Sequence, residues 1–367
     1  MVHVLHVAQP TTGGVARYVD QVAADQAQRG WTVTVAAPTD FRAQAQADGV
    51  RWMAWAATRS PGPSTVEEAR RLRSLVRAAG PDVVHLHSAK AGMAGRLALR
   101  GAVRTVFQPH AWSWLAASGA QAVAARAWER HAGRYWTSLL VCVGEGEAEV
   151  GRRAGVGGPL VVVRNGVDLA HHRVAGDVDR RRARSRLGVP AYAPLAVCVG
   201  RSSPQKGQDV LVRAWPRVRA ECPEARLLLV GEVQDGGIRV APDLDGVEQV
   251  GSVADVRPCY AAADVVVIPS RWEGLSLTAL EALAAGRSVV ASDVPGLADA
   301  VTAGTGALVP PEDPDALAAA LTVRLRDPIR TRREGSAARR RAAEFDLRAT
   351  TERLAELTEA LVTGRAG

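Results

Sequence analysis

Two glutamates stand eight positions apart in the stretch SRWEGLSLTALEALAAG, residues 270–286. Glu273 precedes a Gly-Leu-Ser turn, whereas Glu281 lies inside a run of good helix formers that ends at Gly286. A carboxylate inside an apolar helix is costly unless a ligand or a hydrogen-bond donor satisfies it. The spacing therefore indicates either a binding site that uses both carboxylates or two solvated charges on an ordinary helix.

The backbone between the two glutamates favours a site. A β-branched run, DVVVIP (264–269), predicts a strand directly before the turn, and the predicted helix begins just after Ser276. Gly274, Leu275 and Ser276 would then offer backbone N–H groups at a helix N-terminus, which favours anions. A sugar nucleotide fits this pattern, because its diphosphate can bind the amides while its hydroxyls donate to the carboxylates.

Two cations follow another predicted strand. In VCVGRSSPQKGQDVLVRAW (197–215), Arg201 comes directly after the strand, and Lys206 precedes Gly207 and a predicted helix. Arginine binds phosphate oxygens bidentately, and lysine binds them as a point charge. The arrangement predicts a diphosphate site; the alternative is a pair of solvated loop cations.

A pair of glycines, Gly13 and Gly14, lies at the first strand-to-helix turn, in HVAQPTTGGVARYVDQVA (6–23). Paired glycines let the backbone approach a ligand closely, although a plain tight turn explains them equally well. The full dinucleotide fingerprint G-x-G-x-x-G does not occur at this turn, which argues against a nicotinamide enzyme.

These motifs all follow predicted strands of α/β domains, because short β-branched runs alternate with Ala/Leu/Arg-rich helical patterns. The expected helices include 15–29, 65–80 and 122–136. The expected strands are 3–8, 32–37, 82–87, 105–110, 139–144, 160–165, 195–200, 226–231, 247–251, 264–269, 288–292 and 306–310. Ligands of parallel sheets bind outside the carboxyl ends of the strands, so we predict two doubly wound, Rossmann-like domains that face each other across an interdomain cleft.

The boundary between the domains is predicted near residue 165. Residues 1–165 would form the first domain, completed by the C-terminal helix 345–367, and residues 166–344 would form the second. The segment TRREGSAARRR (331–341) is expected to be a solvated basic helix.

The sequence resembles the family 4 glycosyltransferases, a retaining, metal-independent class with the two-domain GT-B fold. The resemblance covers nearly the whole chain. Besides the two glutamates and the glycine pair, it rests on the segments PHAW (109–112), NGVD (165–168), GRSSPQKG (200–207) and GSVADVRPCYAAADVVVIPSRWEG (251–274).

The resemblance implies an acceptor-side first domain, a nucleotide-sugar-binding second domain, and roles for single residues. Arg201 and Lys206 would hold the donor diphosphate, and Glu281 would bind ribose. The other implied positions are Glu273 and the Gly274, Leu275 and Ser276 amides at the donor sugar and phosphate, Gly251 and Val253 at the base, His110 beside the transferred sugar, and Gly13 and Gly14 near the reaction centre. Arg201, Lys206, Glu273 and His110 would be the catalytic residues, although a histidine at a strand end is often only a satisfied core residue.

Two departures from the family pattern bear on specificity. The family often has His-Gly where this chain has His110-Ala111, which would alter the space beside the donor sugar. It often has Gly-Phe-Gly after the first glutamate, where this chain has Gly274-Leu275-Ser276, so the donor preference would differ. The segment HSAKAGMAGRLALR (87–100) is similar to the branch that acts on exopolysaccharides and lipid-linked saccharides.

The predicted reaction moves a sugar from a nucleoside diphosphate sugar, with a UDP-sugar favoured, to an acceptor hydroxyl with retention. The implied cations and helix amides would stabilise the departing phosphate, so no metal and no other cofactor is expected. A nucleotide-sugar epimerase or a phosphorylase-like enzyme of the same fold is the alternative. A non-enzymatic nucleic-acid-binding protein is more remote, because aromatic residues are not interleaved with Lys and Arg.

The positive charge of the chain is unevenly placed. Residues 1–165 contain 19 Lys and Arg against 11 Asp and Glu, which accounts for the whole net charge of +8. The excess predicts an anionic partner, such as a bilayer surface bearing a lipid-linked saccharide and contacted through helix 65–80; a soluble small acceptor and an Arg-rich composition without such a partner are the alternatives. No secretory signal or membrane-spanning run is evident, and the four cysteines are scattered. We therefore expect a cytoplasmic protein, peripheral at the inner face of the membrane if the lipid alternative holds, with no nucleic-acid partner.

Overall fold

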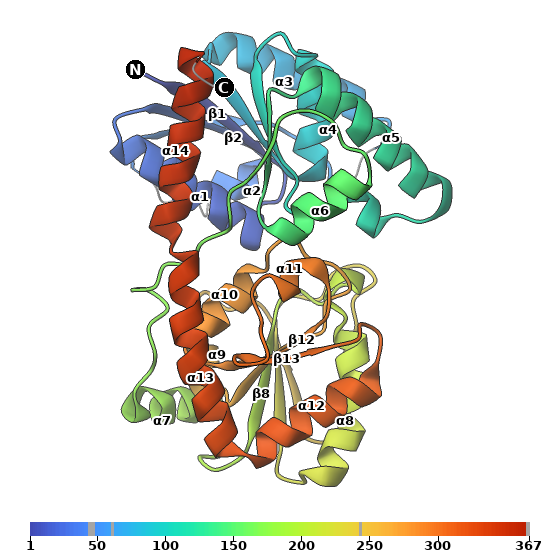
Figure 1. The fold of residues 1–367 in the computed structure, drawn as a ribbon, viewed down its shortest axis with the longest axis vertical. Helices are drawn as coiled ribbons and strands as arrows, with labels where there is room; N and C mark the ends of the chain where they lie inside the picture. Colours follow the sequence, from blue (N-terminus) through green and yellow to red (C-terminus); the bar gives the residue numbers. More distant parts are fainter. Residues whose placement is uncertain (43–47, 60–61, 242–243, 365–367) are drawn as a thin grey trace. The chain divides into compact units, whose positions relative to one another are not determined.

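The computed structural model describes residues 1–42, 48–59, 62–241 and 244–364. The chain divides into two compact units, which we call unit 1 (residues 1–164 with the segment from 348 onward) and unit 2 (residues 165–347). Each unit contains a parallel β-sheet with helices on both faces (Figure 1). The predicted fold class of two doubly wound α/β domains is therefore confirmed.

The sheet of unit 1 has the strand order β3-β2-β1-β4-β5-β6-β7, so the order reverses between β1 and β4. Its strands are β1 (His3–Ala8), β2 (Thr32–Ala37), β3 (Val50–Ala54), β4 (Val83–His87), β5 (Arg104–Gln108), β6 (Leu139–Cys142) and β7 (Leu160–Val162). The edge strand β3 was not predicted, because its residues VRWMA are only partly buried and do not form a continuous apolar run.

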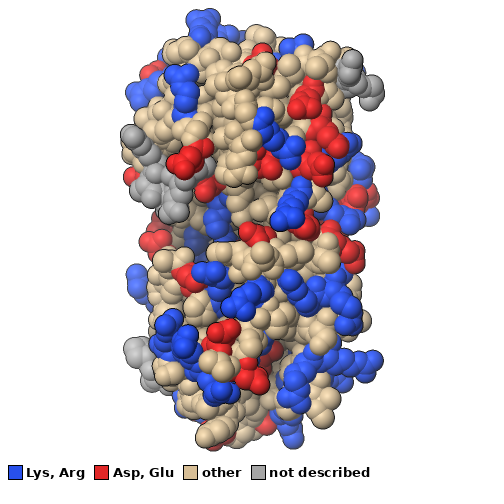
Figure 2. Space-filling view, turned by 90° about the vertical axis from the view of Figure 1, so that its left-hand side faces the viewer, with Lys and Arg blue, Asp and Glu red and all other residues tan. Residues whose placement is uncertain are grey.

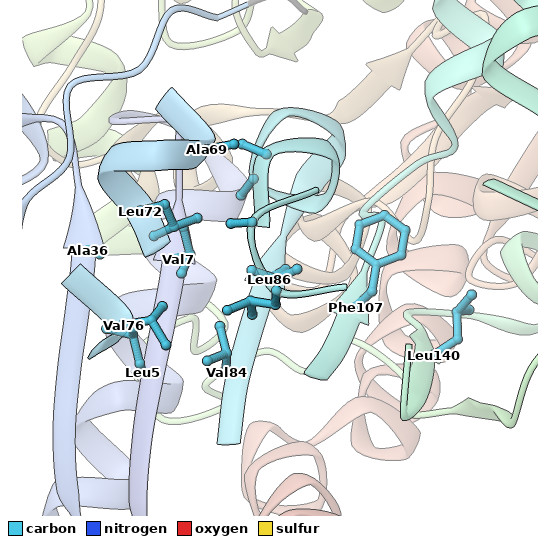
Figure 3. Close-up of a cluster of buried hydrophobic side chains, with 14 of the residues drawn as sticks. Leu5, Val7, Ala36, Ala69, Leu72, Val76, Val84, Leu86, Phe107 and Leu140 are labelled. Carbon is cyan, nitrogen blue, oxygen red and sulfur yellow. The ribbon is translucent and has the colours of Figure 1, made fainter. Parts of the chain in front are cut away.

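The helices of unit 1 cover both faces of this sheet. They are α1 (Gly14–Gln28), α2 (Thr39–Arg42), α3 (Thr65–Ala79), α4 (Ser88–Leu99), α5 (Gly119–Trp136), α6 (Glu145–Arg153) and α14 (Leu347–Thr363), with a 3-10 turn at Ser113–Ala116. Figure 3 shows Leu72 and Val76 of α3 beside Leu5, Val7 and Val84 of the sheet.

Helix α4 approaches the same apolar face through its glycines. A Cβ atom on Gly92 would lie 2.2 Å from the ring of Phe107, so only glycine allows this contact. The helix also carries a fully buried cation, because the Arg96 guanidinium lies 2.8 Å from the Glu129 carboxylate of α5. The packing of α4 therefore explains the residues of segment 87–100 without a functional role.

The opposite face of the sheet is packed by α1 and α14. Leu354 of α14 is buried together with Tyr18 and Val22 of α1 and with Val83 and Val106 of the sheet. Side chains alternate between the two faces along a strand. The residues of β1 and β4 next to those that face α3, such as Leu5, Val7 and Val84, therefore point to this second face. Three of them are histidines, His6, His85 and His87, and all three are buried.

Unit 2 repeats the same topology. Its six-stranded sheet has the order β10-β9-β8-β11-β12-β13, with the reversal between β8 and β11. The strands are β8 (Leu195–Val199), β9 (Arg226–Val230), β10 (Val247–Val250), β11 (Val265–Ile268), β12 (Ser288–Ser292) and β13 (Gly306–Val309).

Helices α8 and α12 pack together on one face of the second sheet, and α10 and α13 pack together on strands of the same sheet. The helices are α7 (Asp177–Arg186), α8 (Gln208–Glu221), α9 (Arg257–Ala262), α10 (Leu277–Ala284), α11 (Pro295–Ala298), α12 (Pro314–Arg326) and α13 (Pro328–Ala342), with 3-10 turns at Pro204–Lys206 and Ala343–Phe345. Within the described residues, no helix is both long and apolar enough to cross a membrane.

The expectation of a solvated helix at 331–341 is wrong in part. Helix α13 buries one side, where a Cβ atom on Gly335 would lie 2.3 Å from the carbonyl oxygen of Gly286. Glu334 is also buried and lies 2.9 Å from the Arg324 guanidinium. Small residues and one paired carboxylate therefore form a buried stripe within a segment whose composition looks basic and exposed.

The packing of α14 leads to a stability prediction. Leu354 is 3% exposed, so Leu354→Ala should lower the free energy of unfolding of unit 1 by about 2–4 kcal/mol. The neighbouring Arg353→Ala is the control, because this exposed side chain makes only a surface ion pair with Glu356. Hydrogen exchange of the β4 and β5 amides measures the change. Equal protection in the two variants would contradict the packing described.

Candidate functional site

The residues predicted to bind the donor lie at the carboxyl ends of the strands of unit 2, around the point where the strand order reverses. Arg201 follows β8, Lys206 ends the 3-10 turn Pro204–Lys206, and Glu273 lies in the loop after β11. In open parallel sheets this is where ligands bind. The structure thus brings three candidates from distant parts of the sequence to one edge of one sheet.

Lys206 and Glu273 contact each other directly. The Nζ atom of Lys206 lies 2.6 Å from Oε1 of Glu273, and the hydroxyl of Ser270 donates to the same oxygen over 2.8 Å. The Glu273 side chain is 8% exposed and that of Lys206 is 21% exposed. The Glu273 carboxylate is therefore the counter-ion of the lysine, and Ser270 holds that carboxylate in place.

The turn that carries Lys206 is fixed by a glycine. Gly207 has a φ of 62°, and a Cβ atom there would lie 2.0 Å from the carbonyl oxygen of Pro269. A larger residue is excluded by both the backbone conformation and the close approach. The lysine turn and the loop after β11 are consequently held against each other by their backbones.

The backbone of the 274–276 loop is positioned from the start of unit 2. The side-chain amide of Asn165 donates to the carbonyl oxygen of Leu275 over 2.8 Å. Leu275 is itself buried, at 3% exposure. Ser276 is the residue before α10, which begins at Leu277 as predicted. Asn165, from the NGVD segment, therefore supports the loop at the N-terminus of α10.

The second glutamate is buried inside its helix and has partners there. Glu281 is 4% exposed, and the hydroxyl of Tyr260 donates to its Oε2 atom over 2.8 Å. Nε2 of His172 lies 4.0 Å from Oε1 of Glu281. These partners offset part of the cost of burying a carboxylate. Sequence reasoning assigned no role to Tyr260, although it lies in the recognised segment 251–274, and it did not identify His172.

Next to these partners lies a pocket of about 230 Å³, whose lining includes His172, Tyr260, Arg182 and Arg257. Its lining does not include Arg201, Lys206 or Glu273. The two predicted residues at the nucleotide base, Gly251 and Val253, follow β10 and are exposed, with open space around the Cα atom of Gly251. They are exposed and do not line this pocket.

In unit 1, His110 lies just beyond β5 in a turn with an unusual backbone. His110 has a φ of 54°, and Ala111 has a φ of 101°. Glu147 of α6 anchors this turn, because its Oε1 accepts the Ala111 amide and its Oε2 accepts the Val143 amide. The Trp112 indole donates to the backbone carbonyl of the same glutamate. Glu147 is a positioning residue that the sequence did not reveal.

Buried histidines lie behind His110. Its Nε2 atom is 3.1 Å from Nδ1 of His87, whose own Nε2 is 3.0 Å from Nδ1 of His6. Burial lowers the pKa of His6 to about 4 and that of His110 to about 3, and it lowers the pKa of His87 well below its usual range. All three rings are therefore neutral at pH 7. In the sequence, the repeated histidines of DVVHLHSAKAG were the signal that could have revealed this cluster of buried histidines.

The paired glycines lie at the start of α1, after the carboxyl end of β1. Gly13 precedes the helix with a φ of 83°, a conformation that favours glycine, and its carbonyl accepts the Arg17 amide. No acidic residue lies in the first turn of α1. The turn is thus open to an anion, although its glycine is also explained by the backbone alone.

The helix 65–80, predicted to contact a membrane, is α3 in the structure. Its Arg70, Arg71, Arg73 and Arg77 are exposed. Glu67 lies 3.7 Å from Arg70 and 3.1 Å from Arg71, so part of this charge is compensated. On the face displayed in Figure 2, basic and acidic side chains are interspersed. On this face the positive charge is therefore not gathered in one patch.

The backbone at Ala111 leads to a second stability prediction. A φ of 101° is costly for alanine and not for glycine, so Ala111→Gly should raise the free energy of unfolding by about 1 kcal/mol. Ala117→Gly is the matched control, because Ala117 has a φ of −117° and should be destabilised by the same change. Urea denaturation compares the two. A lower midpoint for both variants would contradict the strain at Ala111.

The buried histidines predict a pH dependence of stability. The folded-state pKa values of His6 and His110 lie below the unfolded value of 6.5. Between these values the histidines are protonated in the unfolded chain but neutral in the folded protein, so a fall in pH favours unfolding. Stability should be full above about pH 6.5 and fall by a few kcal/mol as the pH approaches 4, at roughly 1.4 kcal/mol per unit of pKa shift. Denaturation from pH 7.5 to 4.5 measures this loss. Burial also lowers the pKa of His85 well below its usual range. His85→Leu removes this ring, and a slope as steep as that of the wild type would contradict the burial of neutral histidines as the cause.

Both halves of the chain match models of glycosyltransferases. Residues 12–171 match the model described as Glycosyltransferase Family 4, and residues 193–327 match the one described as Glycosyl transferases group 1.

Two curated relatives are similar to this chain. The D-inositol 3-phosphate glycosyltransferase of Kineococcus radiotolerans is 38% identical over 232 residues, which cover 56% of this chain and 53% of the relative. A GDP-mannose-dependent monoacylated alpha-(1-6)-phosphatidylinositol monomannoside mannosyltransferase of Corynebacterium glutamicum is 35% identical over 208 residues, which cover 53% of this chain and 55% of the relative. The chain spans about half the length of the curated relatives it matches.

Solved structures of low identity share the fold. The sucrose-phosphate synthase of Thermosynechococcus elongatus superposes with a TM-score of 0.82 at 23% identity and covers 99% of this chain and 100% of that one. The Anabaena protein HepE, in complex with UDP and glucose, gives a TM-score of 0.83 at 22% identity and covers 98% and 100%. The fold is therefore GT-B. The first half of the chain is similar to the family 4 glycosyltransferases and the second half to the group 1 glycosyl transferases.

Proposed function

We propose that this protein transfers a sugar from a nucleoside diphosphate sugar to an acceptor hydroxyl, with retention and without a metal ion or other cofactor. The observation that carries the proposal is the contact between Lys206 and Glu273 at the carboxyl edge of the sheet in unit 2. It unites a phosphate-binding cation and a hydroxyl-binding carboxylate beside the N-terminus of α10. These are the two kinds of group that a sugar nucleotide requires at one place.

In this proposal the donor diphosphate displaces Glu273 from Lys206 and takes the lysine as its own counter-ion. Arg201 and the amides of residues 274–276 bind the same phosphates. When the bond between the anomeric carbon and the β-phosphate oxygen breaks, negative charge grows on that phosphate, and the fixed cations stabilise it. The acceptor oxygen bonds to the same face of the sugar, and its proton passes to the departing phosphate.

The remaining residues position the donor. Glu281 accepts hydrogen bonds from the ribose hydroxyls, and Tyr260 orients its carboxylate through the bond to Oε2. Glu273, once released, accepts from the sugar hydroxyls and is not a nucleophile. His110 contacts the transferred sugar, and Gly13 and Gly14 bring the backbone of unit 1 close to the acceptor.

A UDP-sugar is the favoured donor, because HepE, a protein of the same fold, has been solved with UDP-glucose. The Corynebacterium relative is named as GDP-mannose-dependent, so the base is a question for experiment. For the acceptor we propose a phosphorylated or lipid-linked hydroxyl compound, since both relatives are named for such acceptors and unit 1 carries the excess of positive charge. We place the reaction in the cytoplasm, with the exposed arginines of α3 as the surface for peripheral membrane contact.

The test combines donor binding with turnover. A thermal-shift screen against UDP-, GDP-, ADP- and dTDP-sugars should show stabilisation by one of them and none by NAD⁺. Arg201→Ala and Lys206→Ala should each lower transfer by about a hundredfold or more without loss of folding, as expected for groups that stabilise transition-state charge, and Glu281→Ala should mainly weaken donor binding. Turnover should persist in EDTA.

Arg213→Ala is the matched control, because Arg213 is an exposed cation of the same region that pairs with Asp209 and Glu312. It should leave donor binding and transfer unchanged. Near-normal turnover in both cation variants would overturn the proposal, as would stabilisation by NAD⁺ alone. Interconversion of the donor without transfer would indicate an epimerase, and release of sugar phosphate would indicate a phosphorylase-like enzyme.

A further inference from the structure

A continuous row of hydrogen-bonded side chains runs through unit 1 and ends at His110. It begins at Gln26 on α1, passes through His6 of β1 and His87 of β4, and reaches His110 beyond β5. The three links measure 2.7 Å from Gln26 to His6, 3.0 Å from His6 to His87 and 3.1 Å from His87 to His110. Gln26, His6 and His87 are each at most 1% exposed, so water does not compete for these bonds.

The strand register explains why the row exists. His6 and His85 are direct neighbours across β1 and β4, and His87 lies two residues further along β4, on the same face of the sheet. His85 and His87 stack with ring centroids 4.1 Å apart. His85 lies beside the row but makes none of its three links.

The proton count of the row follows from the neutral state of its rings. A neutral imidazole has one N–H donor and one unprotonated nitrogen that accepts. Each ring in the row must therefore donate on one side and accept on the other. Once one end of the row is fixed, every tautomer along it is fixed too.

The Gln26 end sets the direction. The amide presents its oxygen, Oε1, to Nε2 of His6, and an oxygen can only accept. His6 then carries its proton on Nε2 and accepts on Nδ1 from Nε2–H of His87. His87 in turn accepts on Nδ1 from Nε2–H of His110. The unprotonated nitrogen left over at the end of the row is Nδ1 of His110.

We propose that Gln26, His6 and His87 are positioning residues that fix the tautomer of His110, so that His110 presents an unprotonated Nδ1 atom to a hydroxyl group of the substrate. The inference rests on the proposed function, which places His110 beside the transferred sugar. A hydroxyl can donate to this nitrogen, whereas a tautomer with the proton on Nδ1 could only donate to the hydroxyl oxygen. Among the described residues, no side chain or backbone group hydrogen-bonds to Nδ1 of His110.

The ring of His110 is also held in orientation. Tyr18 packs edge-on against it with a centroid distance of 4.9 Å, and the Tyr18 hydroxyl accepts a hydrogen bond from the Gln108 amide over 2.9 Å. Rotation of the imidazole would break the link to His87 and this ring contact together. The row therefore fixes both the ring position and the location of its proton.

A metal ion is the competing use of the same histidines. The ring nitrogens of His6, His85 and His87 lie within 4.8 Å of one another. Two ligands of one zinc ion lie at most about 4.2 Å apart, because each Zn–N bond is about 2.1 Å long. The bond of 3.0 Å between His6 and His87, and the outward partners Gln26 and His110, are explained by the hydrogen-bonded row without an ion.

Nuclear magnetic resonance of ¹⁵N-histidine-labelled full-length protein at pH 7.5 tests the proposal directly. His6, His87 and His110 should each show a protonated Nε2 and an unprotonated Nδ1. Gln26→Met removes the acceptor at the far end without touching His110, and it should convert the His110 signal to a mixture of tautomers. An unchanged His110 signal in this variant, or a wild-type His110 protonated on Nδ1, would overturn the proposal.

A pair of variants at the middle of the row supplies the kinetic test. His87→Asn keeps an acceptor close to where Nδ1 stood, and His87→Leu removes it. His87→Leu should raise KM for the sugar nucleotide about tenfold, the loss of one hydrogen bond, and His87→Asn should restore it to within about threefold. Equal losses in both would show a merely structural role and overturn the proposal.

The outcomes separate this inference from the proposed function. The tautomers are measured without substrate. If the protein transfers no sugar, the proposed function is wrong, but the ¹⁵N signals still show whether the hydrogen-bonded row fixes the His110 tautomer. Stoichiometric zinc in the purified protein, with metal-shifted resonances of His6, His85 and His87, would overturn the row in favour of a metal site. If His87→Leu does not fold, Gln26→Met carries the test alone.

Discussion

A parallel strand whose two faces are both covered by helices has no side on which to meet solvent. Its polar chemistry is confined to its ends, and in a doubly wound sheet the carboxyl ends gather at one edge. Both units of this protein obey that constraint. Arg201, Lys206 and Glu273 lie at such an edge in unit 2, and Gly13 and His110 lie at such an edge in unit 1. The buried sheets thus determine where each unit can bind a ligand before any single residue is chosen.

The histidines of β1 and β4 are an exception to that confinement, since they lie in the interior of a sheet face. A buried polar group is costly unless it is hydrogen-bonded. Gln26, His6, His87 and His110 hydrogen-bond to one another, and the neutral state of the rings avoids burying charge. Nε2 of Gln26 has no hydrogen-bond partner among the described residues. The interior of unit 1 therefore tolerates polar side chains because they form a row that reaches the edge.

Much of the fold could be predicted from sequence because its signals are local. The run VVVI (265–268) is apolar and β-branched, HVLHVA (3–8) is apolar apart from its two histidines, and the helix 277–284 is bounded by Ser276 and Gly286. Strand β3 carries no such run and was missed. The segment 331–341 was judged by its arginines, whereas Gly335 and Ala338 form the stripe that packs. The helical spacing of small residues within this charged segment was the signal that could have predicted its buried side.

The candidate site was predictable as a set of residues but not as a set of contacts. Sequence identified Arg201 and Glu273 after predicted strands, Lys206 before a predicted helix, and Glu281 eight positions beyond Glu273. It did not reveal the pairings: Tyr260 with Glu281, Asn165 with the 274–276 loop, and Glu147 with the turn at Ala111. Such pairings depend on tertiary packing, which a single sequence does not display.

The contact between Lys206 and Glu273 has a consequence for the end of a catalytic cycle. A cation that attracts phosphate strongly enough to stabilise a departing nucleotide also tends to retain it. Glu273 is attached to the same edge of the sheet and is held 2.6 Å from the lysine when no nucleotide intervenes. In the proposed cycle it would act as an intramolecular competitor that is always present at high effective concentration. Each nucleotide that leaves would be replaced by the carboxylate, so the ion pair would speed product release at the expense of donor affinity.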